Sequence, residues 1–396
     1  MKEQSTVLVA FGDALAAPEA CYSLIDAGFI VHVACRRAVD CGIRKSGLVS
    51  IHDVTPPEVD YQRAIDELVA LARSCGASAV LPLDDLSLWM VSRHRSQFDC
   101  PIAAASETAV EVAMDKRKQI EFAKAAGFLV PETGDFNQNL QTLPWDSFPC
   151  ILKGALAARP EGKALGRGRA FFCDSPEGLR DARGHDAPDN PMILQAWQRG
   201  VGVGVFGFRT AEGIRAWSGH RRIRMMNPAG SGSSCCESNP PSDETKLTVA
   251  AFLELIDWHG LFMVELLEGP DGKQWFMELN GRTWGSMALA RAGGMEYPAW
   301  AVQDAMNALP NLPQSMNEVA CRGRHFGREL VHFLLVLRGP GRNVGMDWPG
   351  RFSTVLHLLS RKRGDRWYNL RRGDMKVFRS DAIQCVRSQI FRKGKS

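Results

Sequence analysis

The chain has 396 residues, of which 45% are hydrophobic and 23% charged, which is enough apolar material for two or three packed cores. Its apolar runs fall short of the about 20 residues that a membrane-spanning helix needs, and Asp13 interrupts the N-terminal apolar stretch before a signal-peptide core can form, so we expect a cytoplasmic protein. The 11 cysteines are scattered without a CxxC pair, which indicates reduced thiols rather than a disulfide framework or a zinc site.

The net charge of +4 is distributed unevenly along the chain. Residues 322–396 hold 18 Lys and Arg against 5 Asp and Glu, so this segment carries +13 and the rest of the chain −9. Such a basic segment attracts nucleic acid, anionic lipid or an acidic partner, although most charge runs are solvated faces. We expect no specific nucleic acid, leave weak contact with an anionic membrane surface open, and predict that this segment packs back on the core. Apolar stretches such as residues 330–337 are too short to span a membrane.

The first hundred residues alternate between strand and helix patterns. TVLVAFG, APEACYSLIDAGF and IVHVACRR predict strand, helix and strand, and YQRAIDELVALARSCG with AVLPLDD adds an amphipathic helix and a buried strand that ends in acidic residues. This order is typical of a parallel, Rossmann-like α/β domain. The first turn, FGDALAAP, lacks the GxGxxG that lets a backbone approach pyrophosphate, so a nicotinamide oxidoreductase is the least favoured function.

From about residue 106 the pattern changes. MDKRKQIEFAKAAG predicts a helix closed by Gly127, and FPCILKG predicts a short buried strand that ends at Lys153. The glycine-rich, basic segment EGKALGRGRAFFC contains Lys163 and is typical of a mobile loop that closes over phosphates. PMILQAWQRGVGVGVFGF then predicts a strand, a hinge and a second strand, and ELVHFLLVLRG and STVLHLLSRKR near the C-terminus predict short helices.

A hairpin is predicted in GLFMVELLEGPDGKQWFMELN. If Asp271 and Gly272 form a two-residue type I′ turn, counting outward sets Glu265 opposite Glu278. Side chains alternate along a strand, so Asn280 joins Glu278 on one face while Met277 and Leu279 point into the core. Facing like charges destabilise a sheet unless something compensates them. Two carboxylates and an amide suit Mg²⁺, and a solvated edge hairpin with splayed charges is an equal alternative.

In order, DK…AGFLVP, FPCILKG, the glycine-rich loop, LQAWQRG, MVE and MELNGR resemble the motifs of the ATP-grasp superfamily, best its carboxylate-amine ligase-like members. MELNGRTWGSMALARAGGMEYP is similar to the metal-binding strand of carbamoyl phosphate synthetase. The resemblance covers about residues 1–310. It implies an α/β and α+β chain with a Rossmann-like pre-ATP-grasp domain over 1–105, an ATP-grasp domain over 106–320 with a lid subdomain at about 148–195, and a basic C-terminal extension over 321–396.

The resemblance further implies an ATP-dependent ligase that binds Mg-ATP, with Mn²⁺ as an alternative metal, between two subdomains. A small-molecule or peptide carboxylate would become an acyl phosphate that an amine attacks. The implied metal ligands are Glu265, Glu278 and Asn280. Nucleotide contacts are assigned to Lys116, Lys153, Lys163, Gln195, Trp197 and Gln198. The catalytic role is assigned to Arg282 with Lys153. Substrate contacts are assigned to four residues of the segment WSGHRRIRMMNPAGSGSS, namely Arg221, Arg222, Arg224 and Ser233.

Three departures from the family pattern keep other functions open. Gly281 replaces the usual proline of Asn-Pro-Arg, Ala196 stands where the hinge glutamate is expected, and the acidic residue expected soon after Gly200 to hold the ribose is absent from VGVGVFGF. The missing hinge and ribose acids keep a degenerate nucleotide-binding scaffold as an alternative. A phosphotransferase on the same fold is another alternative, because acyl phosphate and phosphoester formation use the same lysines and metals. Several assigned side chains also have an alternative role that is only structural. For Arg282 the alternative is a surface ion pair, and for Lys116 and Lys153 it is an exposed position on a helix or at the end of a strand. For the arginines it is an ordinary basic strand followed by a flexible loop. His220 is interpreted as structural.

Overall fold

The computed structural model describes residues 4–136, 148–185, 190–230, 232–315, 321–340 and 348–390. The N-terminal unit is a parallel sheet in the order β3-β2-β1-β4. Its strands are β1 Thr6–Ala10, β2 Ile30–Arg36, β3 Ser50–Val54 and β4 Ala77–Pro82, and its helices are α1 Ala17–Asp26, η1 Gly42–Lys45, α2 Tyr61–Ser74, α3 Asp85–Arg93 and η2 Arg95–Gln97. The strands and helices predicted along residues 6–82 are therefore present.

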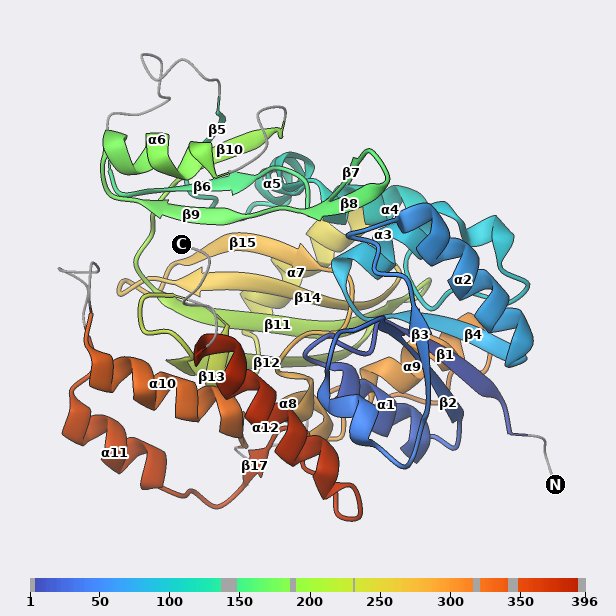
Figure 1. The fold of residues 1–396 in the computed structure, drawn as a ribbon. Helices are drawn as coiled ribbons and strands as arrows, with labels where there is room; N and C mark the ends of the chain where they lie inside the picture. Colours follow the sequence, from blue (N-terminus) through green and yellow to red (C-terminus); the bar gives the residue numbers. More distant parts are fainter. Residues whose placement is uncertain are drawn as a thin grey trace.

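A second, smaller sheet forms the lid over the rest of the molecule (Figure 1). It follows helices α4 Glu107–Met114 and α5 Lys116–Ala125 and has the strand order β5-β10-β6-β9. The strands are β5 Thr133–Asp135, β6 Cys150–Gly154, β9 Ala170–Cys173 and β10 Met192–Ala196, covered by α6 Pro176–Gly184; β7 Ala158–Glu161 and β8 Ala164–Arg167 form a separate hairpin. Leu152, Leu179 and Leu194 make a small core between the lid sheet and α6.

The large central sheet has seven strands in the order β15-β14-β11-β12-β13-β16-β17. They are β11 Val201–Thr210, β12 Gly213–Met225, β13 Ser233–Ser238, β14 Gly260–Glu268, β15 Gln274–Asn280, β16 Arg322–Arg324 and β17 Asp365–Trp367. The associated helices are α7 Asp243–Leu255, α8 Met287–Ala292, α9 Tyr297–Ala305, α10 Phe326–Arg338, α11 Arg351–Leu359 and α12 Met375–Ile390. One face packs on α7 through Val264 and Phe276, and part of the other packs through Phe206 on Trp284 and Tyr297.

The basic C-terminal segment packs back on the core, as predicted. β16 and β17 extend the central sheet, and α10 contacts β13 while α12 contacts both α10 and η1. Asp374, before α12, accepts hydrogen bonds from the hydroxyls of Tyr22 and Ser46 at 3.1 and 2.6 Å.

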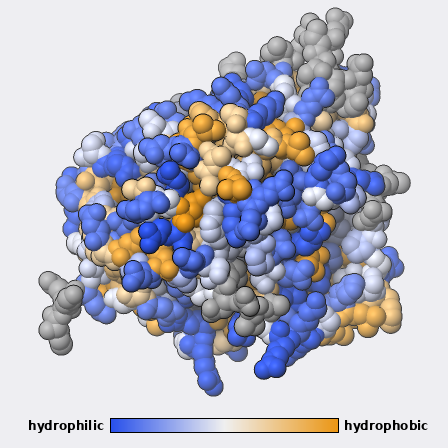
Figure 2. All heavy atoms as spheres, turned by 180° about the vertical axis from the view of Figure 1, so that it is seen from behind, coloured by the Kyte–Doolittle hydropathy of each residue, from blue (hydrophilic) through white to orange (hydrophobic). Residues whose placement is uncertain are grey.

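In the parts of the chain that the structure describes, no helix is long and apolar enough to cross a membrane. From behind, the surface is mostly hydrophilic with separate hydrophobic areas (Figure 2).

The turn of the β14–β15 hairpin differs from the prediction, but the predicted pairing of its two carboxylates is present. The Gly269 amide donates to the Lys273 carbonyl at 2.8 Å, so three residues, not two, make the turn. The longer turn shifts the pairing of the two strands by one residue, and a bulge in β15 at Met277 shifts the pairing back. Glu265 therefore pairs with Glu278 as predicted. The predicted core position of Met277 is wrong, because the bulge leaves it partly exposed while Phe276 and Leu279 fill the core.

The glycine that follows Asn280 has a steric reason. A Cβ on Gly281 would lie 2.1 Å from Cη2 of Trp258. Trp258 is fully buried, and its indole nitrogen donates to the Leu261 carbonyl at 3.1 Å. The indole therefore occupies the space that the ring of the family's usual proline would need.

We expect Gly281→Ala to lower the free energy of unfolding by about 1–3 kcal/mol, because the added methyl group overpacks the Trp258 ring. Gly47→Ala is the matched control, since a Cβ there meets nothing within 4 Å. Urea unfolding of both variants measures the difference. Adding Trp258→Phe to Gly281→Ala should recover part of the loss, and strictly additive effects of the two substitutions would contradict the contact.

Candidate active site

Two carboxylates and an amide lie together on the β14–β15 hairpin of the central sheet. Glu265 and Glu278 face each other across the β14–β15 ladder, and the Asn280 amide nitrogen donates to Glu278 Oε1 at 3.3 Å. Burial raises the pKa of Glu265; the Arg222 guanidinium opposes this effect, and the neighbouring Glu278 carboxylate adds to it. The three predicted metal-ligand positions are thus brought together.

Cationic side chains surround these carboxylates. Arg222 of β12 forms an ion pair with Glu265, with Nη2 and Oε1 2.5 Å apart. Lys153, at the end of β6 in the lid, is 8% exposed, and burial together with the neighbouring Lys116 lowers its pKa to about 8, while Glu278 and Glu265 act in the opposite direction. Because both carboxylates act on the pKa of Lys153, this lysine of the lid lies within electrostatic range of Glu265 and Glu278 of the central sheet.

The chemistry of the donors fits a hard divalent cation. Within the described ranges no group of three or more His, Cys, Asp or Glu side chains is arranged so that it could hold a metal ion by itself. Two carboxylates and one amide oxygen match the partial, oxygen-only shell with which proteins hold Mg²⁺ that also binds phosphate. The residues present therefore suit the implied metal.

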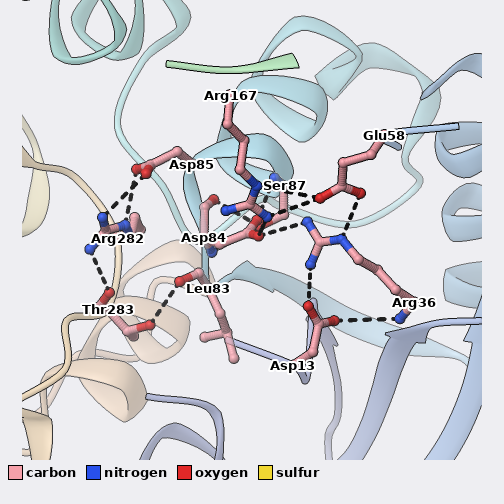
Figure 3. Close-up of polar contacts among 10 residues, drawn as sticks. All are labelled: Asp13, Arg36, Glu58, Leu83, Asp84, Asp85, Ser87, Arg167, Arg282 and Thr283. Atoms are coloured by element: carbon pink, nitrogen blue, oxygen red, sulfur yellow. Dashed lines mark hydrogen bonds and ion pairs between the residues drawn. The ribbon is translucent and has the colours of Figure 1, made fainter. Parts of the chain in front are cut away.

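Arg282 is held in an ion pair with the N-terminal unit (Figure 3). Its Nε and Nη2 lie 3.0 and 3.2 Å from the two carboxylate oxygens of Asp85, at the start of α3, and its Nη1 donates to the Thr283 carbonyl at 3.1 Å. The ion pair that was the alternative assignment for Arg282 is thus present. Burial opposes a raised pKa of Arg282, but the pKa is raised overall because the Asp85 carboxylate acts in the opposite direction. The Glu278 carboxylate makes a smaller contribution of the same sign as Asp85.

A second charged cluster lies beside this pair, at the carboxyl ends of β1, β2 and β4 (Figure 3). The Arg36 guanidinium donates to Asp13, Glu58 and Asp84 at 2.6, 2.9 and 2.7 Å. Arg167, from the β7–β8 hairpin, donates to Asp84 Oδ2 at 2.7 Å and to Glu58. The cluster therefore joins the hairpin to the N-terminal unit.

Much of the glycine-rich segment with Lys163 belongs to the β7–β8 hairpin, so its prediction as a loop is wrong there. Lys163 is exposed at the turn between β7 and β8, and its carbonyl accepts from the Tyr61 amide at 2.9 Å. Leu165 is fully buried, and its amide donates to the Pro57 carbonyl at 2.8 Å. Because the hairpin tip is bonded to the N-terminal unit, Lys163 is not brought to the carboxylates.

The hinge residues line a cavity beside strands β11, β12 and β14 of the central sheet. Trp197 and Gln198 lie on the wall of a cavity of about 530 Å³ that also includes Gly202, Arg222 and Leu267. Trp197 packs edge-on against Phe172 of the lid, with ring centroids 6.0 Å apart. Gln195 is 1% exposed and donates its amide to Thr133 Oγ1 at 2.9 Å, so its side chain is bound to the lid sheet.

The predicted substrate residues are not all gathered in one pocket. Arg221 is on the opposite face of β12 from Arg222 and pairs with Glu268, and Arg224 pairs with Glu329 of α10. The Ser233 hydroxyl, at the start of β13, accepts from the Cys236 thiol at 3.1 Å. Residue 231 of the same loop lies outside the described residues. Arg222 alone of these four assigned residues pairs with a predicted metal ligand.

Two positioning residues were missed by the sequence interpretation. Asp85 holds Arg282, and its signal was the pair of acidic residues that ends the strand pattern AVLPLDD. Gln119 of α5 is 3% exposed, and its Oε1 accepts from the amide of Leu279 at 2.7 Å. A glutamine inside a charged helix pattern gives no sequence signal for this contact with β15.

No model of a protein family matches this sequence, and neither does any curated protein. Solved structures do match. An L-amino acid ligase from Bacillus licheniformis is 14% identical with a TM-score of 0.60, and the match covers 77% of this chain and 75% of the ligase. A biotin carboxylase from Campylobacter jejuni, solved with β-γ-ATP, is 17% identical with a TM-score of 0.59 over 79% of this chain and 72% of that one.

An N5-carboxyaminoimidazole synthetase from Staphylococcus aureus is 13% identical with a TM-score of 0.60, and the match covers 87% of this chain and 88% of that one. These neighbours are ATP-grasp enzymes. Together with the lid, the hinge cavity and the facing carboxylates, the likeness establishes the architecture: the chain has the ATP-grasp fold.

Proposed function

We propose that the protein is an ATP-dependent ligase that joins a carboxylate to an amine through an acyl phosphate. The observation that carries this proposal is that Lys153 of the lid, Lys116 of α5 and the carboxylates Glu265 and Glu278 of the central sheet lie within electrostatic range of one another. Burial and Lys116 lower the pKa of Lys153 to about 8, and the two carboxylates oppose this effect. A lysine facing two carboxylates is the arrangement needed to hold nucleotide phosphates on one side and a cation on the other. Structural neighbours that are ligases of this kind support the assignment.

The proposed domain roles follow the sequence boundaries. Residues 1–105 form a Rossmann-like pre-ATP-grasp domain, residues 106–320 the ATP-grasp domain with its lid at about 148–195, and residues 321–396 a basic extension. The nucleotide would lie in the cavity at Trp197 and Gln198, with its phosphates toward Lys116 and Lys153. Arg222 at the edge of that cavity would take the substrate carboxylate.

In the proposed reaction a carboxylate oxygen of the substrate attacks the γ-phosphorus of ATP, and ADP leaves. The amine nitrogen then attacks the acyl carbon, phosphate leaves, and the nitrogen loses a proton. Lys153 and Arg282 would stabilise negative charge on the transferred phosphoryl group. Mg²⁺ held by Glu265, Glu278 and Asn280 would supply charge neutralisation on the phosphate oxygens.

A degenerate nucleotide-binding scaffold is the second candidate, and the absent carboxylates at the hinge and after Gly200 favour it. Incubation with Mg-ATP and mixed amino acids separates the two. The ligase releases ADP and phosphate in an amino-acid-dependent manner, whereas the scaffold binds nucleotide and releases neither product. Release of AMP would contradict the acyl-phosphate route.

We expect Glu278→Gln to lower metal-dependent nucleotide turnover by about 100-fold, since removal of groups that only support metal ligands already costs 10–100-fold. The amide keeps the shape of the side chain, so the protein should fold, and relief of the repulsion from Glu265 should raise metal-free stability by up to about 1 kcal/mol. Glu254→Gln on the exposed face of α7 is the control. Parental turnover with unchanged Mg²⁺ dependence in Glu278→Gln would refute the site.

Nucleotide affinity should depend on the charge of Lys153. Its pKa in the folded protein is lowered to about 8, so the charged form that attracts phosphate is present below that pH and is lost above it. We expect the ATP dissociation constant to increase above pH 8, by up to about tenfold per pH unit. In Lys153→Arg the increase should be absent, whereas Lys118→Arg, a neighbouring exposed lysine, should keep it. An identical pH profile in all three proteins would show that Lys153 does not contact the phosphates.

Trp197→Ala should weaken ATP binding by about tenfold, because loss of one aromatic ring beside a base removes about 1–3 kcal/mol. Calorimetric titration with a non-hydrolysable ATP analogue measures the change. Trp89→Ala in the N-terminal unit, away from the hinge, is the matched tryptophan control. An unchanged dissociation constant in a folded Trp197→Ala protein would place the base elsewhere.

A further inference from the structure

We propose that the outer surface of α10 and α11 docks the protein on an anionic lipid surface. In α11 the side chains of Phe352, Leu356 and Leu359 are 77%, 53% and 74% exposed. They are spaced i, i+4 and i+7, so they form one apolar stripe along the helix. Such exposure of three large apolar residues on a nine-residue helix is unusual for a surface that faces only water.

A second stripe lies on the neighbouring helix. In α10, Leu330, Leu334 and Leu337 are exposed with the same spacing, at 39%, 46% and 42%. α10 and α11 contact each other, and the view from behind shows hydrophobic residues at the lower right edge, the side on which these helices lie (Figure 2). The two stripes together make a larger apolar area than either helix alone.

α11 is attached to the molecule by its carboxyl end. Arg324 donates to the carbonyls of Leu358 and Ser360 at 2.6 and 3.0 Å, and Arg322 donates to the carbonyl of Ser360 at 2.9 Å. Thr354 is the buried residue of this fully described helix. The attachment fixes the helix by its backbone and leaves its apolar stripe turned outward.

Among the described residues of the C-terminal extension, the exposed charges on and beside the stripes are of one sign. In the described parts of the C-terminal extension no carboxylate is exposed: Glu329 and Asp374 are buried, and Asp365 and Asp381 are half-buried against Arg322 and His325. The exposed basic residues on and beside the two helices are Arg338, Arg351, Arg361, Lys362, Arg363 and Arg366. An anionic surface would therefore meet positive charge at both ends of the α11 stripe.

This combination favours a lipid surface over an acidic protein. Interfacial helices carry large apolar residues on one side with Lys and Arg beside them, and the long basic side chains reach headgroup phosphates while their stems lie on apolar surface. Each basic residue near an anionic membrane adds to binding, and salt screens that attraction. The contact would be peripheral and reversible.

Sedimentation of the full chain with phosphatidylcholine vesicles, with and without phosphatidylglycerol, tests the proposal. We expect binding to the anionic vesicles only, and its loss in high salt. The triple variant Arg361→Ala, Lys362→Ala, Arg363→Ala should lower the partition coefficient by about 100-fold. The triple variant Phe352→Ser, Leu356→Ser, Leu359→Ser should lower it by at least about tenfold.

The control is Leu247→Ser with Leu255→Ser on α7, where the exposed leucines lack a basic cluster, and this variant should bind like the parent. Parental rates of Mg-ATP turnover or parental unfolding midpoints in the variants show that they fold. Equal binding to neutral and anionic vesicles, or none to either, overturns the proposal. So does a dimer in sedimentation velocity that the serine variant dissociates, because a second copy would then cover the stripes.

Discussion

Two carboxylates face each other across one ladder of the central sheet, and the arrangement around them compensates their repulsion. Glu265 and Glu278 are paired in register and partly removed from water, where like charges repel more strongly. Arg222 reaches them from the same sheet and Lys153 from the lid. A cation bound to the nucleotide phosphates would neutralise the remaining negative charge of the two carboxylates. It would also take over part of the neutralisation of Glu265 that Arg222 now supplies.

The units of the chain meet around this pair. Lys153 couples the lid to the central sheet, and Arg282, two residues after Asn280, couples the central sheet to Asp85 of the N-terminal unit. Gln119 bonds the backbone of β15 from α5. The lid, the N-terminal unit and the carboxylates are therefore linked through side chains, two of which, Lys153 and Arg282, also have a role in the proposed chemistry.

Much of this arrangement could be predicted from the sequence. Alternating apolar patterns gave the strands and helices of the N-terminal unit, and the Asp-Gly pair marked the hairpin. The facing of Glu265 and Glu278 was predicted although the turn has three residues, because the bulge at Met277 cancels the shift. Local pattern does not reveal a bulge, since its extra residue is compatible with either face.

The rest depended on partners far away in the sequence. Arg221, Arg222 and Arg224 have similar surroundings in the sequence but pair with three different carboxylates on different elements. The segment around Lys163 has the composition of a loop, and only the burial of Leu165 against the N-terminal unit makes it an ordered hairpin. The amino-acid composition of a segment does not show that it packs against another part of the chain.

The central claim is that Glu265, Glu278 and Asn280 hold the cation that bridges nucleotide phosphates opposite Lys153. Crystals grown with Mn²⁺ and a non-hydrolysable ATP analogue test it directly through the anomalous signal of manganese. We expect a manganese peak within coordination distance of both carboxylates and of the analogue's phosphates. A bound analogue whose manganese peak lies away from Glu265 and Glu278 would contradict it.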